Sequence, residues 1–410
     1  MPATLSSSAL AVPHSRIREL AEIAMGMEGV YKLYFGESNA PTPDYIKRAA
    51  QKAMADGYTY YTENAGLPTL RRALARYYSE LHGVELDPTS EIAITASGVQ
   101  ALNVAIRCML DPGDEGIVLT PSWPNGAAIM QMSNATPREV PYVLSGGRYS
   151  IDFDALERAV TPRTRMLLYT SPSNPLGWVA SEDDQEKLLE FTRRHNLWLM
   201  ADEVYERLYY PALTNPAAAE KGKPGSKTMS SKTISPAPSI LQKCTRDDAV
   251  VAIQSLSKSH CMTGWRIGWL VGRKDLVERA SQLNEFIVSC ASGFGQRAGE
   301  TALLWGEDIL RQMVCRLREN RDYCMSVLSK VGRVTVPLPD GAFYLFVKVE
   351  GVTDSFAFCR QLLMETKVGL APGVAFGAGG EGNVRICYAS DRPILEEAMA
   401  RVKLFLESRR

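Results

Sequence analysis

A lysine in a serine-rich segment is the residue of this sequence best placed for covalent chemistry. Lys258 lies in the stretch SLSKSHCMTGWRIGWLVG, residues 255–272, with apolar runs on both sides and Arg266 a short way downstream. This pattern predicts an amine at the end of a buried strand. Burial and a neighbouring cation both lower the pKa of an amine, which then becomes a neutral nucleophile able to attack a carbonyl group. The alternative interpretation is a surface lysine in a polar loop.

Two further charged side chains stand on apolar strands. The strand LWLMA runs directly into Asp202, and Arg385 lies inside the apolar run NVRICYA. A buried carboxylate needs a positive partner to stay ionised. A guanidinium binds a carboxylate through two parallel hydrogen bonds, so Arg385 suits an anionic substrate group. The alternatives are a helix cap for Asp202 and a structural ion pair for Arg385.

The elements that must position these side chains alternate between strand-like and helix-like runs from residue 91 onward. Such alternation predicts a parallel sheet covered on both faces, with ligands beyond the carboxyl ends of the strands. Ser97 and Gly98 start a helix at one such end, where free N–H groups suit a phosphate. Trp123 follows the next strand, where the residues alone also allow an ordinary core tryptophan. Asn174 stands in a proline-rich turn that presents its side-chain amide.

The lysine segment resembles the lysine motif of class I pyridoxal-phosphate aminotransferases. The pattern Ser-x-Ser-Lys, a gap and Gly-x-Arg-x-Gly is matched by Ser255, Ser257, Lys258, Gly264, Arg266 and Gly268. The family's Asn-Pro-Thr-Gly is matched at residues 174–177, except that Leu176 replaces the threonine. Tyr61 has the family's spacing to Gly66, although it lies in a tyrosine cluster of the kind that often serves packing. The resemblance runs from about Leu33 to about Ala389.

This resemblance implies a role for each matching residue toward pyridoxal 5'-phosphate and the substrate. It assigns the phosphate to Ser97, Gly98, Val99, Ser255, Ser257, Arg266 and, from the second subunit of a dimer, Tyr61. It assigns the rest of the cofactor to Lys258 as an imine, Asp202 at the ring nitrogen, Trp123 on the ring face, and Tyr205 with Asn174 at the phenolic oxygen. The substrate is assigned to Gly36, Trp123, Asn174 and Arg385. The implied catalytic residues are Lys258, Asp202 and Tyr205.

One position bears on the choice of substrate. In branches of the family that prefer aspartate, a cationic side chain often stands beside the phosphate-binding glycine, and Val99 occupies that position here. Unless an arginine of the partner subunit compensates, this residue favours an uncharged or broad range of amino donors.

The resemblance also implies the architecture. It predicts a fold-type I α/β protein: a large domain with a mostly parallel, seven-stranded-type sheet flanked by helices, a smaller α/β domain, and a homodimer with shared active sites. The expected divisions are an N-terminal arm with part of the small domain over 1–50, the large cofactor-binding domain over 51–300 and the small domain over 301–410. Residues 211–245, rich in Pro, Ser, Ala and Lys, are interpreted as a surface insertion.

Composition excludes several other classes of protein. Lys plus Arg and Asp plus Glu are both 46, so neither nucleic acid nor an anionic membrane is an expected partner. The eight cysteines are scattered and form no metal-ligand spacing with the four histidines, which predicts reduced thiols, a cytoplasmic location and no metal site. The GAGGEG run at 377–382 fits a dinucleotide-binding pattern, but it precedes a strand and opens no helix, so we reject that interpretation.

The function predicted from these residues is a pyridoxal-phosphate-dependent aminotransferase that moves an amino group from an L-amino acid to a 2-oxo acid by a ping-pong mechanism. The first alternative is another reaction on the same site, carried out by a lyase, a decarboxylase or a cyclopropane-forming synthase. A cofactor-sensing regulator is the second alternative. It is disfavoured because the sequence shows no basic DNA-binding region ahead of the fold.

Overall fold

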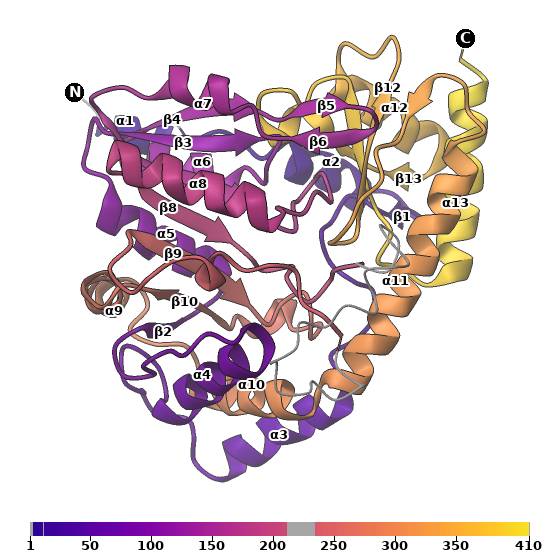
Figure 1. Cartoon of the computed structure of the whole chain (residues 1–410). Helices are drawn as coiled ribbons and strands as arrows, with labels where there is room; N and C mark the ends of the chain where they lie inside the picture. The colour runs from indigo at the N-terminus through magenta and orange to yellow at the C-terminus, as the bar shows by residue number, and fades with distance from the viewer. Residues whose placement is uncertain (1–2, 11, 211–233, 410) are drawn as a thin grey trace, which may run out of the picture.

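A mixed seven-stranded sheet forms the centre of the molecule in the computed structural model, which describes residues 3–10, 12–210 and 234–409 (Figure 1). The strand order is β2-β10-β9-β8-β7-β3-β4. In that order the bounds are Ile92–Thr95, Gly268–Gly272, Val250–Ser255, Trp198–Asp202, Thr164–Thr170, Glu115–Thr120 and Thr136–Pro141. Six of these strands run in the same direction, and β10 runs antiparallel to its two neighbours, β2 and β9. The predicted fold class is therefore confirmed.

Helices cover both faces of this sheet. On one face α5 (Gly98–Met109), α6 (Asn125–Met132) and α9 (Lys274–Ile287) enclose a single apolar cluster. The other face carries α4 (Pro68–His82), α8 (Glu182–His195) and α10 (Gly293–Trp305), and α3 (Asp44–Ala55) packs on α10. The two remaining helices of this part are α1 (Ser7–Leu10) and α7 (Phe153–Ala159), and a small hairpin joins β5 (Val143–Ser145) to β6 (Arg148–Ser150).

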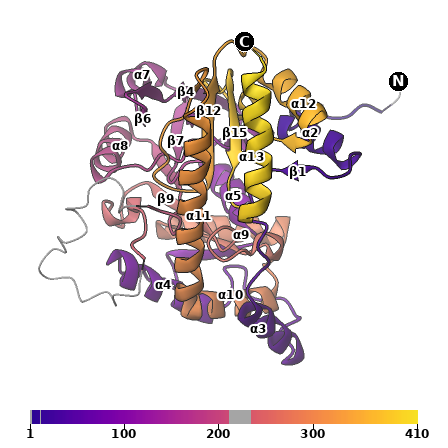
Figure 2. The same ribbon diagram turned by 90° about the vertical axis from the view of Figure 1, so that its right-hand side faces the viewer.

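A smaller unit is built on a four-stranded sheet of order β11-β12-β15-β14. Those strands span Val334–Thr335, Tyr344–Val349, Asn383–Cys387 and Ala371–Pro372, and β1 (Tyr31–Lys32) pairs with β13 (Val368–Gly369) beside them. The long helix α11 (Glu307–Leu328) rises from the large part and runs alongside α13 (Arg392–Glu407), as Figure 2 shows. Helices α2 (Arg16–Met25) and α12 (Ser355–Thr366) complete this unit.

The ends of several helices agree with the sequence patterns because capping residues mark them. Ser181, for example, caps α8 through a reciprocal capping box with Asp184. The part of the chain that the structure describes holds no helix long and apolar enough to cross a membrane.

The interpretation of residues 211–245 as a surface insertion needs correction over its described part. Residues 211–233 lie outside the described ranges. Beyond them, Ala237 and Ile240 are fully buried, and the short 3-10 helix Ile240–Gln242 packs against β9. The Pro- and Ser-rich composition wrongly predicted exposure, because this stretch is irregular in structure and still belongs to the core. The other domain limits stay a prediction.

Candidate active site

A cavity of about 640 Å³ opens at the carboxyl ends of the parallel strands. Side chains that follow β2, β3, β7, β8 and β9 line it, together with residues of the smaller unit. The sequence-predicted residues that line this cavity are Gly36, Ser97, Gly98, Val99, Trp123, Asn174, Asp202, Tyr205, Ser255, Ser257, Lys258, Arg266 and Arg385. Segments more than three hundred residues apart in sequence thus converge on one site.

Lys258 occupies a tight loop directly after β9. The loop is closed by backbone hydrogen bonds from Leu256 N to the Ile267 carbonyl and from Met262 N to the Ser257 carbonyl. The Lys258 Nζ donates a hydrogen bond of 2.5 Å to the carbonyl of Gly36. Burial lowers the pKa of this amine to about 8, and the nearby positive charge of Arg385 acts in the same direction. The amine is therefore much easier to deprotonate than an ordinary lysine.

Asp202 ends strand β8 and lines the same cavity. Burial raises the pKa of its carboxyl to about 6, while a hydrogen bond from the Val204 N–H and the charge of Lys258 oppose that rise. A cation placed against this carboxylate would therefore gain more than one at an exposed site, since little water screens the pair. Tyr205, on the turn after Asp202, joins its hydroxyl to that of Tyr344 at 2.7 Å.

A corner of the cavity that is suited to an anion lies where α5 begins. Ser97 caps the helix by accepting a hydrogen bond from Gln100 N at 3.2 Å, and its φ of 122° is a strained value for a residue with a side chain. The first N–H groups of a helix have no partner within it. A Cβ on Gly268 would come within 2.3 Å of the Gly98 nitrogen, so only glycine lets β10 pass this close.

Hydroxyl and guanidinium groups complete this corner. Ser255 and Ser257 are buried and share a hydrogen bond of 2.7 Å between their Oγ atoms. Arg266 adopts a left-handed backbone conformation and donates from Nη1 to the Thr263 carbonyl at 2.7 Å. Its guanidinium forms no ion pair with any acidic residue of the described ranges. The corner thus gathers positive charge and hydrogen-bond donors around an open space.

Arg385 brings a buried guanidinium to the opposite wall. Its Nη1 donates to Asn174 Oδ1 at 2.8 Å, and its Nη2 donates to the Tyr34 carbonyl at 2.5 Å. The guanidinium also stacks 4.5 Å from the ring centre of Tyr344. Its Nε is buried without a hydrogen-bond partner among the described residues. No carboxylate within residues 3–10, 12–210 and 234–409 pairs with this charge, which leaves it available to an anionic ligand.

Comparisons with known proteins agree with this geometry. The model of the family "aminotransferase class I and II" matches residues 29–402. This chain belongs to the class I and II aminotransferases. It is 31% identical to aromatic-amino-acid aminotransferase 2 of Thermococcus litoralis, over 97% of this chain and 96% of that protein. It is 32% identical to the aspartate aminotransferase of Pyrococcus abyssi, over 97% of this chain and 96% of that protein.

A solved structure shows the same likeness. The aspartate aminotransferase of Thermus thermophilus, solved with maleate, superimposes with a TM-score of 0.86 at 28% identity, covering 98% of this chain and all of that one. The family suggested by the lysine motif is thereby confirmed, and the protein is an aminotransferase enzyme.

Tyr61 is the one predicted residue that this aminotransferase does not bring to the cavity of its own chain. Its side chain is 87% exposed, and the neighbouring Tyr60 is 85% exposed. This exposure leaves its role in the partner subunit's site a prediction.

Several lining residues were missed by sequence reasoning. Tyr344 begins β12, where it touches both Tyr205 and Arg385, and Tyr34 and Phe35 lead into Gly36. Arg18 reaches the cavity from α2. Only the pairing of β12 with β15, which sets Phe346 opposite Arg385, explains why a tyrosine two positions earlier lies near this arginine.

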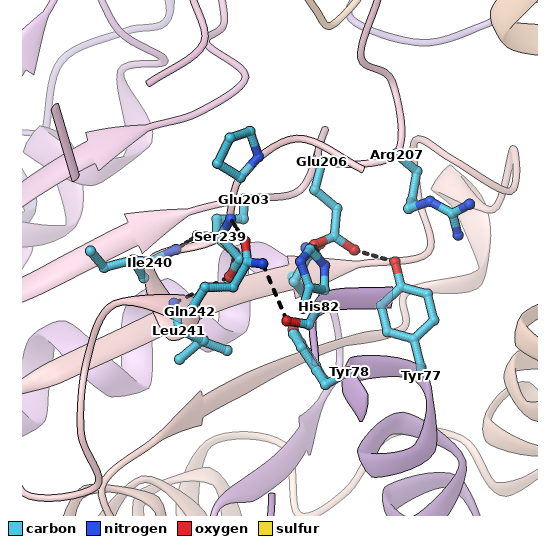
Figure 3. Close-up of polar contacts among 12 residues, drawn as sticks. Tyr77, Tyr78, His82, Glu203, Glu206, Arg207, Ser239, Ile240, Leu241 and Gln242 are labelled. Atoms are coloured by element: carbon cyan, nitrogen blue, oxygen red, sulfur yellow. Dashed lines mark hydrogen bonds and ion pairs between the residues drawn. The ribbon is translucent and has the colours of Figure 1, made fainter. Parts of the chain in front are cut away.

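A buried polar network supports the turn that carries Asp202 and Tyr205 (Figure 3). Glu203 accepts hydrogen bonds from the Ser239 hydroxyl at 2.7 Å and from Ile240 N at 2.8 Å. Glu206 accepts one from the Tyr77 hydroxyl and lies 3.1 Å from His82 Nε2. These contacts connect residues 203–206 to α4 and to the segment before β9, and so stabilise the turn.

Glu203 makes the stability of the protein depend on pH. Burial raises the pKa of its carboxyl to about 7, with Glu206 adding to the rise. A folded state that holds a proton more tightly than the unfolded chain loses stability as pH rises between the two pKa values. The free energy of unfolding of the cofactor-free enzyme should therefore fall between pH 5 and 7.5, with on the order of 3 kcal/mol from this carboxyl.

Glu203→Gln checks this expectation. Urea unfolding at pH 5 and at pH 7.5 gives the change in the free energy of unfolding with pH, which is the slope compared between proteins. The amide keeps the shape of the side chain and removes its titration, so the slope should flatten relative to wild type. Glu190→Gln, at an exposed position of α8, should keep the wild-type slope. An unchanged slope in Glu203→Gln would contradict the assignment.

Proposed function

We propose that this aminotransferase binds pyridoxal 5'-phosphate in the cavity and moves an amino group from an L-amino acid to a 2-oxo acid by a ping-pong mechanism. The main observation behind this proposal is that the half-buried Lys258, whose amine has a lowered pKa, shares one cavity with the buried carboxylate of Asp202 and the buried guanidinium of Arg385. The reactions named for its relatives, transfer from aromatic amino acids and from aspartate, support the same chemistry.

The corner of the cavity at the start of α5 suits the phosphate group of this cofactor. Arg266 supplies a guanidinium with no acidic partner among the described residues, and Ser255 and Ser257 supply hydroxyl groups beside it. The N–H groups at the start of α5 and the positive end of the helix dipole point to the same space. A doubly charged phosphate would satisfy all of these donors together.

Bound pyridoxal phosphate supplies an aldehyde that takes up amino groups and a ring that accepts the electron pair released when a Cα–H bond breaks. Asp202 would keep a proton on the ring nitrogen, and Trp123 would hold the ring. Tyr205 and Asn174 would bind the phenolic oxygen. Arg385, with Asn174 and the backbone at Gly36, binds the α-carboxylate of the substrate and orients its Cα–H bond toward Lys258.

Proton transfer would fall to Lys258. With a pKa of about 8, a useful fraction of its amine is neutral at physiological pH, so it could take the proton from Cα of the substrate and deliver it to the former aldehyde carbon of the cofactor, on the other side of the substrate nitrogen. The amino-acid donor and the 2-oxo acid acceptor bind to Arg385 in turn, because each carries a carboxylate next to its reacting carbon. The two half-reactions therefore share one set of residues.

The proposal includes a homodimer in a reducing compartment such as the cytoplasm. Large apolar side chains besides Tyr61 lie exposed on the described surface, among them Phe286 at 86% and Trp305 at 73%, and a second copy would cover such surface. All eight cysteines are free thiols, which is the usual state of cytoplasmic proteins.

Tyr61→Phe should weaken binding of the cofactor because the lost hydroxyl would otherwise donate to the phosphate in the partner subunit's site. A hydrogen bond to a charged group is worth enough to raise the Kd for pyridoxal phosphate about 10-fold or more. The Kd is measured by absorbance titration of the cofactor-free enzyme. Tyr60→Phe, one residue earlier and equally exposed, should leave the Kd unchanged. Equal effects of both changes would argue against the role of Tyr61.

The function is tested by incubating the loaded enzyme with a panel of L-amino acids, each with 2-oxoglutarate or pyruvate. The expected result is a new amino acid and a new 2-oxo acid in equal amounts. Many turnovers should occur only when both the amino donor and the 2-oxo acid acceptor are present. Continuous turnover of an amino acid without any acceptor would instead indicate a lyase or decarboxylase and overturn the proposal.

A further inference from the structure

Helix α2 carries one arginine into the active-site cavity. Ser15 caps the helix by accepting a hydrogen bond from Arg18 N, and the apolar side of α2 buries Leu20, Ala21 and Ala24. Arg18 lines the same cavity as Lys258. Arg18 is exposed to solvent and also lines the cavity, so its guanidinium stands at the cavity mouth, where a ligand can reach it.

The cavity contains more positive than negative groups, and only this arginine is without a role in the proposed mechanism. The charged side chains that line the cavity are Arg18, Glu37, Asp202, Lys258, Arg266 and Arg385. Arg266 faces the phosphate, Arg385 the α-carboxylate, and Lys258 works opposite Asp202. The guanidinium of Arg18 makes no hydrogen bond and no ion pair within the described ranges. It stacks 5.3 Å from the ring centre of Phe35.

Arg18 and Arg385 lie on elements that pack on each other. Helix α2 packs on β14, and β14 pairs with β15 so that Ala371 lies directly opposite Arg385. Both guanidinium groups are also held against one short segment, because Arg385 donates to the Tyr34 carbonyl and Arg18 stacks on Phe35. The two guanidinium groups therefore come to one cavity from elements that pack on each other, which is the arrangement that binding of two carboxylates of one ligand requires.

We infer that Arg18 is a specificity-determining residue that binds the distal carboxylate of a dicarboxylic amino acid or 2-oxo acid. The inference rests on the proposed function, in which Arg385 binds the α-carboxylate. Val99 alone favours an uncharged donor. Its identity shows only that α5 contributes no cation at that position, whereas Arg18 supplies a cation from α2. Glu37, the other unassigned charge, accepts a hydrogen bond from the Thr263 hydroxyl at 3.2 Å and forms no ion pair with Arg18.

The test uses two ligands that bind without reacting: glutarate, with two carboxylates, and butyrate, with one. Their Kd values for the loaded enzyme are measured by calorimetry, and kcat/KM is measured for L-glutamate and L-alanine. In wild type, glutarate should bind more tightly than butyrate, and added salt should narrow that difference. Arg18→Met should weaken glutarate binding and lower kcat/KM for glutamate about 10-fold, and Arg18→Lys should restore part of the loss.

The effect should be confined to the second carboxylate, so butyrate binding and the alanine reaction should change less than about twofold. Arg16→Met is the matched control, because Arg16 lies on the same helix, pairs with Glu19 and does not line the cavity. It should leave all four measurements unchanged.

Three results would overturn the inference. Glutarate and butyrate could weaken equally in Arg18→Met, which would make Arg18 a purely structural residue. Wild type could bind glutarate no better than butyrate. The enzyme could instead prefer lysine or ornithine and lose that preference in Glu37→Gln. Glu37 would then bind the distal amine of a cationic substrate at the cavity mouth. Failure of the proposed function is distinguishable, because wild type would then form no 2-oxo acid from any donor in the panel.

Discussion

Replacing Lys258 with alanine is expected to lower kcat by at least about 10⁴-fold, because one side chain supplies both the covalent anchor and the proton-transfer group. No other lysine lines the cavity of the described chain. The loss should come without unfolding, since the amine makes one hydrogen bond, to the Gly36 carbonyl, and removing it relieves a buried positive charge. Thermal unfolding should show a cofactor-free variant at least as stable as wild type.

Borohydride reduction followed by peptide mass spectrometry identifies the anchoring residue directly. Wild type loaded with pyridoxal phosphate should carry the reduced cofactor on Lys258, and Lys258→Ala should carry none. Lys274→Ala, at an exposed position at the start of α9, should be labelled and active like wild type. Label on a different lysine in the wild-type enzyme would remove the basis of the proposed function.

The parts of the site that the sequence predicts best are those that follow from strand ends. Asp202 ends an apolar strand, Lys258 and Asn174 follow the ends of two others within a few residues, and parallel strands bring their carboxyl ends to one edge of a sheet. Reading the runs as parallel strands was therefore enough to place these side chains near one another. Arg385 could be identified as well, because a guanidinium inside an apolar strand is costly without an anion.

The parts that the sequence did not predict depend on packing between distant elements. Tyr344 reaches Tyr205 only because β12 pairs with β15 in one register, and an aromatic residue in a strand gives no sign of that register. Arg18 reaches the cavity only because α2 packs on β14. The charged side of an amphipathic helix looks the same whether it faces solvent or a ligand, so this arginine carries no signal in its own segment.

Burial of residues 237–241 was missed for a related reason. These residues have no periodicity, since they bind through backbone and side-chain groups to Glu203 and Glu206 and belong to no long helix or strand. Composition rich in proline and serine is typical of exposed loops, but the same residues also form compact turns when a buried acid accepts their donors. Glu203 next to Asp202 was the one available signal, because two adjacent buried carboxylates need separate partners.

Asp202→Asn is expected to lower kcat about 10³-fold while changing the affinity for the cofactor far less, because the carboxylate acts mainly on the proton of the ring nitrogen. A loss of that size corresponds to about 4 kcal/mol of transition-state stabilisation, a plausible value for a charge pair in a buried site where water screens little. The side chain is 5% exposed, and asparagine has nearly the same shape, so the cavity should keep its form.

Asp202→Glu separates charge from position. It retains the carboxylate but moves it by one methylene, and it should recover part of the activity that Asp202→Asn loses. The measurements are kcat for the full reaction and the absorbance spectrum of the bound cofactor, which reports the protonation of the ring. If Asp202→Asn kept wild-type kcat and spectrum, the ring nitrogen would need no anionic partner. The raised pKa of Asp202 would then reflect burial without function, and the electron-accepting role assigned to this cavity would have no support.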